Sequence, residues 1–330
     1  MSRNIPEKRA FTLVELLVVV AIIGLILGLL LPAVQAAREA SRRMTCTSNL
    51  RQIGLGVQNY VSTYYRLPAG CILNTPFPGT SAYYDVWGEA ETGPQGTSWM
   101  VAILPFIEQH ALFDRWDFST NVAGNRDVAE TDIPIFYCPS RRSGIRSEDE
   151  ERMFFGMTAG GTDYGGCQGR ANGYRNQCSA GLSHGCGHRF VYASTILGHD
   201  GEFQGALTPN QQLRFPEFVD GTSRTFLVGE LQRLLPEPEA TGYDKSERQS
   251  DDGWAVGGAS TLFNTPIAGA YGSDSGHPGG FNNQFFESAG SEHPGGANFV
   301  MVDGAVQFIE DSIDPVIYSY YGSVRDSTAQ

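Results

Sequence analysis

An uncharged stretch near the N-terminus constrains this chain more than any other feature. Residues 16–37, twenty-two in number, carry no charged side chain and lie between Glu15 and Arg38. As a helix they extend about 33 Å, enough to cross a bilayer core of about 30 Å. The residues before the stretch are mainly basic: Arg3, Lys8 and Arg9 against one acid, Glu7. Because a positive flank stays in the cytoplasm, we expect residues 11–33 to span the membrane and the rest of the chain to lie outside.

A carboxylate stands at the start of this stretch. Glu15 would cost about 2.5–3.5 kcal/mol at the centre of a bilayer and less near its edge, so an acid there generally has a partner. Cleavage between Ala10 and Phe11 would create an α-amine four residues from Glu15. That amine can pair with Glu15 of its own chain or with Glu15 of a neighbouring copy. The second pairing is useful only where helices stack in an assembly.

Residues 8–20 read Lys-Arg-Ala-Phe-Thr-Leu-Val-Glu-Leu-Leu-Val-Val-Val and resemble the N-terminal signal of type IV prepilins and pseudopilins. The resemblance implies that a prepilin peptidase removes the leader 1–10 and methylates Phe11. It also implies that Glu15 sets the registry of subunits. Pro32 stands where many pilins have a helix-bending proline. One position departs from the family pattern, since the residue before the cut is Ala10 instead of glycine.

Two other interpretations of the N-terminus remain. Val34-Gln35-Ala36 is similar to the small-residue site that signal peptidase cleaves, which would remove the apolar stretch. Alternatively, the helix stays as an uncleaved anchor. Neither interpretation explains why Glu15 lies within Phe-Thr-Leu-Val-Glu, whereas the prepilin interpretation does.

Residues 65–330 are numerous enough to fold around a core of their own. Hydrophobic residues make up 41% of the chain and aromatic residues 11%, which argues against disorder. Forty glycines in 330 residues favour a loop-rich extracytoplasmic head. The formal net charge of −13 repels phosphate backbones, so nucleic acid is not an expected partner.

Residues 11–64 are predicted to form one long helix. Beyond Pro32, apolar residues recur every three or four positions, which indicates an amphipathic stripe that packs on the head. The stripe consists of Leu50, Ile53, Val57, Tyr60 and Tyr64. Leu67-Pro68-Ala69-Gly70 ends the helix.

Short elements are predicted in the head. The patterns indicate a helix over 98–113 that is kinked at Pro105, strands over 133–138 and 225–230, and a last helix that begins at Pro315. Residues 156–190, rich in glycine and cysteine, are expected to be an insertion. These elements predict an α+β head with an antiparallel sheet and loop insertions.

The clearest strand pattern is a hairpin over 297–309. Asp303-Gly304 is predicted to form its two-residue turn. Pairing across that turn sets Met301 opposite Val306 and Phe299 opposite Phe308. All four side chains would then share one apolar face that covers a helix.

Several internal segments extend the resemblance beyond the leader. His293, nine intervening residues and Asp303-Gly304 form the H-X9-DG arrangement of a large uncharacterised family of bacterial pilin-like proteins. Four further segments are similar to that family: Arg42–Cys46 with Asn49-Leu50, Ile103–Gln109, Phe136–Ser140, and Asp220–Ser223 with Val228-Gly229-Glu230. The resemblance implies a pilin-like architecture for nearly the whole chain and assigns no activity.

Six cysteines occur, at Cys46, Cys71, Cys138, Cys167, Cys178 and Cys186. An even number outside the cytoplasm favours disulfides, and fifteen connectivities are possible. Cys46 and Cys138 belong to two of the family-like segments, so we expect them to pair and to staple the first helix to the head. The other four would form two more bridges around the insertion.

No firm metal site is expected, although two sets of residues are candidates. His184, Cys186 and His188, with Cys178 nearby, carry zinc-type ligands. Asp251, Asp252, Asp274 and Glu292 offer oxygen ligands for calcium, in an acidic loop of the kind that some pseudopilins use. His293 and Asp303 are separated by a strand of about 25–30 Å, at roughly 3.3 Å per residue. Turn formation is therefore the expected role of both.

The sequence predicts a structural subunit. We expect it to be anchored in the inner membrane by one span, with prepilin peptidase and other pilin or pseudopilin subunits as partners, in a type IV pilus or a type II secretion pseudopilus. The alternative is a membrane-tethered head that binds a glycan or a secreted substrate. An enzyme is not expected, because none of the common hydrolase, metalloprotease or nucleotide-binding motifs occurs in the sequence.

Overall fold

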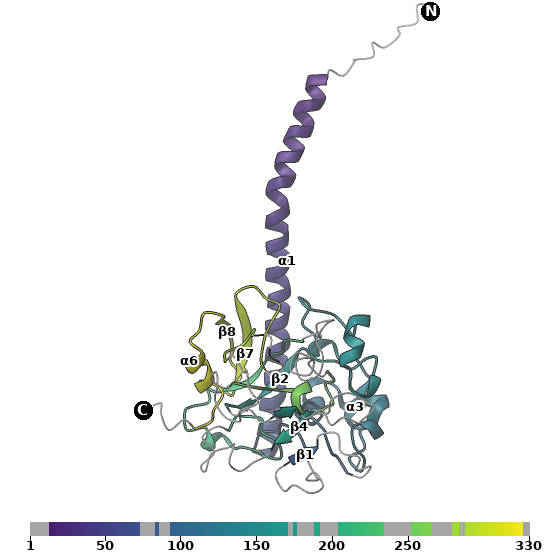
Figure 1. Cartoon of the computed structure of the whole chain (residues 1–330), viewed down its shortest axis with the longest axis vertical. Coiled ribbons are helices and arrows are strands. Elements are labelled where there is room, and N and C mark those ends of the chain that lie inside the picture. Colours follow the sequence, from purple (N-terminus) through teal and green to yellow (C-terminus); the bar gives the residue numbers. More distant parts are fainter. Residues whose placement is uncertain are drawn as a thin grey trace, which may run out of the picture.

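The computed structural model describes residues 13–72, 83–85, 93–170, 174–176, 188–191, 204–233, 252–265, 279–283, 285 and 288–325. Its first element, α1 (Leu13–Tyr64), is a 52-residue helix whose N-terminal half stands clear of the head (Figure 1). Apolar side chains from Leu13 to Val34 are exposed. The helix is long and apolar enough to cross a membrane. Its exposed apolar surface needs lipid or other helices around it.

The second half of α1 packs on the head. Leu50, Ile53 and Val57 are fully buried, so the predicted stripe lies on the head as expected. It ends earlier than predicted, because Tyr64 is 50% exposed. The helix approaches the sheet closely at Gly54, where an added Cβ would lie 2.8 Å from Val300 Cγ1.

The remaining helices are short. They are α2 (Trp99–Ile103), α3 (His110–Phe113), α4 (Arg126–Ala129), α6 (Pro315–Tyr320), and the 3-10 helices η1 (Leu104–Ile107), η2 (Ala123–Asn125), η3 (Pro134–Phe136), η4 (Ser147–Arg152), η5 (Phe154–Gly156), η6 (Phe215–Glu217) and η7 (Gly258–Ser260). The strands are β1 (Tyr83–Asp85), β2 (Tyr164–Gly169), β3 (Tyr174–Asn176), β4 (His188–Val191), β5 (Phe226–Glu230), β6 (Leu262–Asn264), β7 (Gly296–Met301) and β8 (Val306–Glu310).

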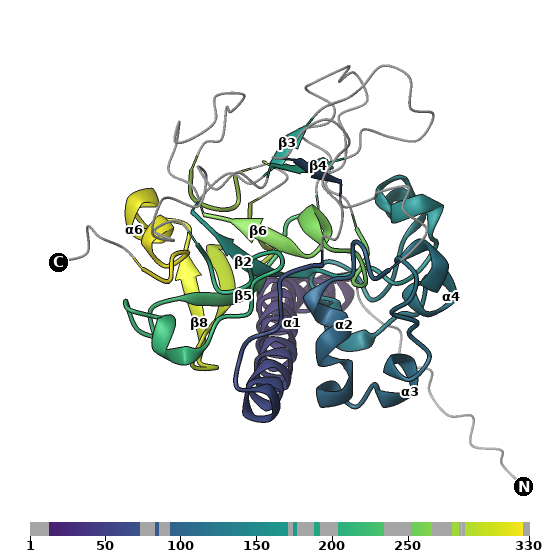
Figure 2. The same cartoon turned by 90° about the horizontal axis from the view of Figure 1, so that it is seen from below.

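The head is built on a five-stranded sheet in the order β6-β2-β5-β7-β8. A smaller sheet has the order β1-β4-β3. α1 contacts β5 and β7 on one side and α2 on the other (Figure 2). The predicted α+β, pilin-like fold is therefore confirmed. One detail differs, because the five-stranded sheet is mixed: β6 runs parallel to β2, while the other pairs are antiparallel.

The C-terminal hairpin forms, but its predicted register is wrong. Val300 pairs with Val306 and Asn298 with Phe308. Gly304 has a φ of 89°, and the amide of Met301 bonds to the carbonyl of Ala305. The loop therefore has three residues, and the pairing shifts by one position.

The shift changes which side chains face α1. Val300 and Val302 pack in the main core with α1, whereas Phe299 and Met301 lie in a second cluster with Tyr318 of α6. A single apolar face made of Met301, Val306, Phe299 and Phe308 does not exist. Side chains of β7 instead contribute alternately to the two hydrophobic clusters, because successive strand residues point to opposite faces.

Two other predicted elements differ from the structure. Residues 133–138 contain the 3-10 helix η3 (Pro134–Phe136) instead of a strand, because Pro134 starts a turn and cannot donate to a ladder. The predicted helix over 98–113 is divided into α2, η1 and α3. Glu108, at a φ of 63°, interrupts it after Pro105. The strand β5 and the helix α6 lie where the sequence predicted them.

The segment 156–190 is more than an insertion, because it supplies β2 beside the centre of the main sheet. Its glycines are needed for packing. An added Cβ would lie 2.4 Å from Leu207 Cδ1 at Gly166 and 2.7 Å from Leu231 Cδ1 at Gly165. Glycine richness in this segment therefore reflects close packing of a strand.

Candidate functional site

A polar cluster joins the buried half of α1 to the head. It consists of Glu39 and Cys46 from α1, Cys138 and Ser140 after η3, Glu230 at the end of β5, and His293 before β7. We call these six residues the His293 cluster. Four separate segments of the chain meet there, and His293 itself is only 3% exposed.

The Nδ1 side of the imidazole faces α1. Nδ1 lies 2.7 Å from Glu39 Oε1 and 3.2 Å from Ser140 Oγ. The Glu39 carboxylate also accepts hydrogen bonds from Ser140, at 3.0 Å, and from Arg42 Nη2, at 2.6 Å. Burial alone would raise the pKa of Glu39. The hydrogen bonds from His293, Arg42 and Ser140 outweigh it and hold that pKa below its usual range.

The Nε2 side faces the sheet and the sulfur atoms. Nε2 lies 3.3 Å from Glu230 Oε1 and 3.6 Å from Cys138 Sγ. Glu230 is held in turn by Asn298, whose backbone amide donates to Oε2 at 2.8 Å and whose side chain donates to Oε1 at 3.1 Å.

His293 is held by two carboxylates. Burial disfavours the imidazolium, but the hydrogen bonds and negative charges of Glu230 and Glu39 outweigh it, so the pKa of His293 is raised. When the imidazole is protonated, its two N–H groups donate charge-assisted hydrogen bonds to Glu39 and Glu230 and so tie α1 to the end of β5.

Cys46 and Cys138 form a disulfide, as predicted. Their Cα atoms are 5.4 Å apart, and the bridge closes a sequence separation of 92 residues. Cys71 and Cys167 are free and buried, so the further bridges predicted for them are absent. Burial raises the pKa of both thiols to about 12, which keeps them protonated and unreactive. Cys178 and Cys186 lie outside the described residues.

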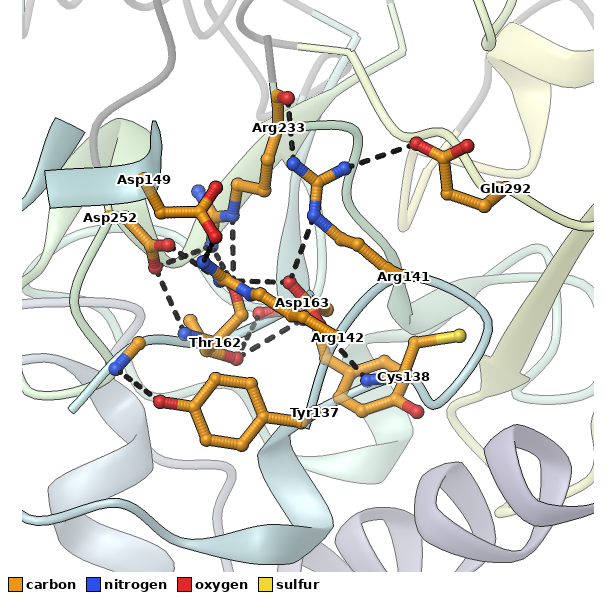
Figure 3. A network of polar contacts seen from close by, with 12 residues as sticks. Tyr137, Cys138, Arg141, Arg142, Asp149, Thr162, Asp163, Arg233, Asp252 and Glu292 are labelled. Atoms are coloured by element: carbon orange, nitrogen blue, oxygen red, sulfur yellow. Dashed lines mark hydrogen bonds and ion pairs between the residues drawn. The ribbon is translucent and has the colours of Figure 1, made fainter. Parts of the chain in front are cut away.

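A buried ion network adjoins the His293 cluster (Figure 3). At its centre, Arg142 lies 2.8 Å from Asp163, 2.5 Å from Asp252 and 3.4 Å from Asp149. Arg233 approaches Asp252 at 3.6 Å. Burial disfavours the charge of Arg142, but the carboxylates outweigh it and raise the pKa of the guanidinium.

The ion network fixes the segment that carries Cys138 and Ser140. The backbone amide of Cys138 donates to Asp163 Oδ2 at 2.9 Å, and Arg141 Nε lies 3.3 Å from Asp163 Oδ1. Asp163 thus links the two arginines to the disulfide. The network is structural, because its charges face one another in the interior.

The structure separates the two ends of the H-X9-DG arrangement, as expected. Asp303 lies in the hairpin turn, where its amide bonds to the carbonyl of Thr222 and its carboxylate accepts from Ala305. Turn formation is therefore the role of Asp303 and Gly304. His293 does more than start the hairpin, since its side chain is the centre of a polar cluster.

Other predicted site residues are placed as follows. Ala10, Phe11, His184 and Asp251 lie outside the described residues, as does Asp274, and the side chain of His188 is not described. Glu15 is in the first turn of α1, and Pro32 lies within its exposed half. The carboxylate of Asp252 is bound by Arg142 and by the amide of Thr162, and Glu292 lies 3.3 Å from Arg141. Calcium at these acids stays a prediction.

Sequence reasoning did not single out Glu39, Ser140, Glu230 or Asn298 as site residues. One signal was present: Glu39 precedes Cys46 by seven residues, or about two helical turns, and therefore shares its face of α1. Ser140 and Glu230 belonged to family-like segments but carried no chemical pattern. Their meeting with His293 is a property of the tertiary fold.

Comparison with known families identifies the class of protein. Residues 6–31 match the model of the prokaryotic N-terminal methylation motif. With its exposed apolar helix, the chain is therefore a pilin-like, membrane-anchored protein of the kind that prepilin peptidase processes. The motif points to a structural subunit instead of an enzyme.

The family follows from a second match. Residues 35–316 match the model described as protein of unknown function (DUF1559), and the chain belongs to that family. No curated protein and no solved structure matched the chain.

Proposed function

We propose that this protein is a structural subunit that is cleaved between Ala10 and Phe11 and assembles through α1 into a type IV pilus or a type II secretion pseudopilus. One observation carries the proposal. The methylation motif leads directly into a helix whose apolar half projects from the head with its side chains exposed. Such a surface is stable in lipid and, after extraction, against the same surface of sister subunits.

Glu15 has a defined role in this assembly. The mature α-amine of Phe11 in an incoming subunit pairs with Glu15 of a subunit already in place, which fixes the axial offset between copies. The attraction is strong in an apolar surrounding, because opposite charges interact more in a low dielectric. Each copy offers one acid and one amine, so the contact repeats from copy to copy.

The head follows α1 as one body. The disulfide joins Cys46 to Cys138, and Gln58 donates to the carbonyl of Val302 at 2.5 Å. Force along the helix therefore reaches the head through covalent and hydrogen-bonded links. An extruded subunit needs this property, since the machinery acts on the helix while the head faces outward.

Mass spectrometry of the mature N-terminus tests the processing step. We expect a chain that begins at N-methyl-Phe11 when the protein is expressed with a prepilin peptidase, and an intact leader when the peptidase is absent. A chain that begins at Met1 in both strains, or after Ala36, contradicts the proposal.

Assembly is tested separately with Glu15→Ala. The variant should reach the membrane and fold but fail to enter sheared filaments or cross-linked oligomers, because the amine of Phe11 loses its partner. Glu310→Gln, an exposed acid at the end of β8, is the matched control and should assemble normally. If Glu15→Ala behaves like this control, the chain is a membrane-tethered binding head instead, with a glycan or a secreted substrate as its ligand.

A further inference from the structure

The Nε2 side of the His293 cluster brings together four metal-binding side chains. Ligand atoms of Cys46, Cys138, Glu230 and His293 all lie within 4.8 Å of one another, and all four residues are buried. Cysteine sulfur, histidine nitrogen and glutamate oxygen are the donors that zinc takes in tetrahedral sites. This set differs from the candidates in the 184–188 and 251–252 segments.

We propose that these four residues bind one zinc ion when the Cys46–Cys138 disulfide is reduced. The ligands are the two thiolates, His293 through Nε2 and one oxygen of Glu230. This inference does not rest on the proposed assembly function. It concerns a second state of the same cluster.

The spacing of the donors fits the proposal. Zinc bonds of about 2.0–2.3 Å in a tetrahedron place neighbouring ligand atoms about 3.3–3.8 Å apart. The structure has Nε2 at 3.3 Å from Glu230 Oε1 and at 3.6 Å from Cys138 Sγ. Nε2 therefore already lies at distances from two other donors that suit a shared ion, and the two sulfur atoms need to separate after reduction.

Surrounding groups hold the donors in the orientation that zinc requires. A zinc-bound histidine generally donates its other ring N–H to a carboxylate. Nδ1 of His293 has this partner in Glu39, at 2.7 Å. Glu39 is itself held by Arg42 and Ser140, and Asn298 holds the oxygens of Glu230.

The two states exchange by balanced chemistry. A dithiol reductant gives two electrons and two protons to the Cys46–Cys138 bond and closes to its own disulfide. Zinc then displaces the two thiol protons and, where the imidazole is charged, the proton on Nε2 of His293. Zinc ligands must be deprotonated, so metal binding and proton release are coupled. Either state ties α1 to the segment after η3, by an S–S bond or through the ion.

A surface hollow of about 400 Å³ is lined by residues on both sides of His293. Its lining includes Arg141, Ser291, Glu292, His293, Pro294 and Gly295. Arg233 and Asp311 also line the hollow, so its two arginines and two acids balance in charge. The hollow is the side from which an ion would approach His293.

Metal binding to the detergent-solubilised full chain tests the proposal. One sample is kept oxidised, and the other is reduced with a dithiol that is then removed by desalting under argon. Both receive zinc, and bound metal is counted by mass spectrometry after a second desalting. We expect one zinc per chain in the reduced sample and none in the oxidised one. Cobalt in place of zinc should give the intense thiolate charge-transfer bands of a tetrahedral site.

Variants of the reduced chain show where the ion sits. His293→Asn and Glu230→Gln should weaken binding by about 100-fold or more, and Glu39→Gln by about 10–100-fold, since it holds a ligand. Cys71→Ser with Cys167→Ser, and Cys178→Ser with Cys186→Ser, are the matched thiol controls and should leave the affinity unchanged. Circular dichroism checks that each variant is folded.

Three outcomes would overturn the proposal. The first is a reduced wild-type chain that holds no zinc, whatever the variants do. The second is equal zinc in the oxidised and reduced samples. The third is zinc that is lost with Cys178 and Cys186 but kept in His293→Asn, which would place the ion in the 184–188 segment.

Discussion

Single residues in this protein act mainly through buried charge. Arg142 and the carboxylate of Asp252 have side chains with no exposed surface and lie 2.5 Å apart. A buried pair adds little to stability compared with apolar residues, but loss of one partner leaves an uncompensated charge. Asp163, which belongs to this network, also accepts a hydrogen bond from the backbone amide of Cys138 and so holds Cys138 in place. The His293 cluster therefore depends on residues that do not touch His293.

The substitution Asp252→Asn tests this dependence. Burial opposes the charge of Asp252, but Arg142 and Arg233 outweigh it and lower its pKa in the folded state. A lowered pKa gives stability that is present above the unfolded value of about 3.9 and is lost as the pH falls below it. We expect the variant to lose about 3 kcal/mol at pH 7, and the difference from wild type to shrink below about pH 4.

Urea unfolding of the detergent-solubilised chain, followed by the fluorescence of the buried Trp99 and Trp254, measures both effects. Asp127→Asn is the matched control, because Asp127 forms an exposed ion pair with Arg115. Such pairs contribute less than about 1 kcal/mol. A constant difference between Asp252→Asn and wild type from pH 7 to pH 3 would show that the charge of Asp252 is not the cause.

At the scale of elements, the two halves of the single helix α1 have different functions. Its first half presents apolar side chains outward, and its second half buries one face on the head. The two functions meet near Glu39, six residues or about 9 Å beyond Ala33, where the expected span ends. Cys46 lies about two turns further along the helix. The disulfide is therefore close to the end of the head that faces the membrane.

Another prediction concerns removal of the Cys46–Cys138 disulfide. In the chain-entropy model, a bridge that closes 92 residues stabilises the fold by about 4–5 kcal/mol. Cys46→Ala with Cys138→Ala should therefore lower the urea midpoint strongly without a reductant. The control variant replaces the two buried free cysteines, Cys71→Ala with Cys167→Ala. Its urea midpoint should fall less, because it loses only the packing of two small side chains. Equal losses in the two double variants would mean that the bridge adds no stability.

Local patterns predicted the elements better than their pairings. The stripe on α1 follows from the helical period, and β5 and α6 follow from apolar alternation and from Asp314 at the start of a helix. The register of the hairpin was missed because Gly304 permits a three-residue loop as readily as a two-residue one.

The candidate site was predicted only in part. The bridge between Cys46 and Cys138 came from the resemblance to a family. Glu39, Glu230 and His293 are separated by 191 and 63 positions in the sequence, and no local pattern marks carboxylates that will meet one imidazole. A polar side chain that becomes buried looks, in sequence, like any exposed one until its partners are known.

At the scale of the whole molecule, one long apolar helix at the N-terminus of a folded head raises the question of which side of the membrane the head occupies. The leader carries three basic residues and one acid, so by the positive-inside rule we expect it to stay in the cytoplasm. The head has a disulfide, which persists in an oxidising compartment. Both observations favour an extracytoplasmic head on an inner-membrane anchor.

This orientation gives the last prediction. Protease added to intact spheroplasts of the expressing bacterium should digest the head, because we expect residues 65–330 to lie outside. It should leave a membrane-bound fragment that contains the start of α1. Substitution of Arg3, Lys8 and Arg9 by glutamate should invert or abolish insertion, since the charge bias that holds the leader inside is reversed. The strain lacks prepilin peptidase, so that residues 1–10 stay attached and an antibody against an N-terminal tag can follow the fragment. A cytoplasmic enzyme checks that the spheroplasts are intact. Arg51→Glu, a basic residue exposed on the head-bound half of α1, is the matched control and should keep the wild-type pattern.

Protection of the wild-type head from protease would place it in the cytoplasm, where neither a lasting disulfide nor extrusion of the head is expected.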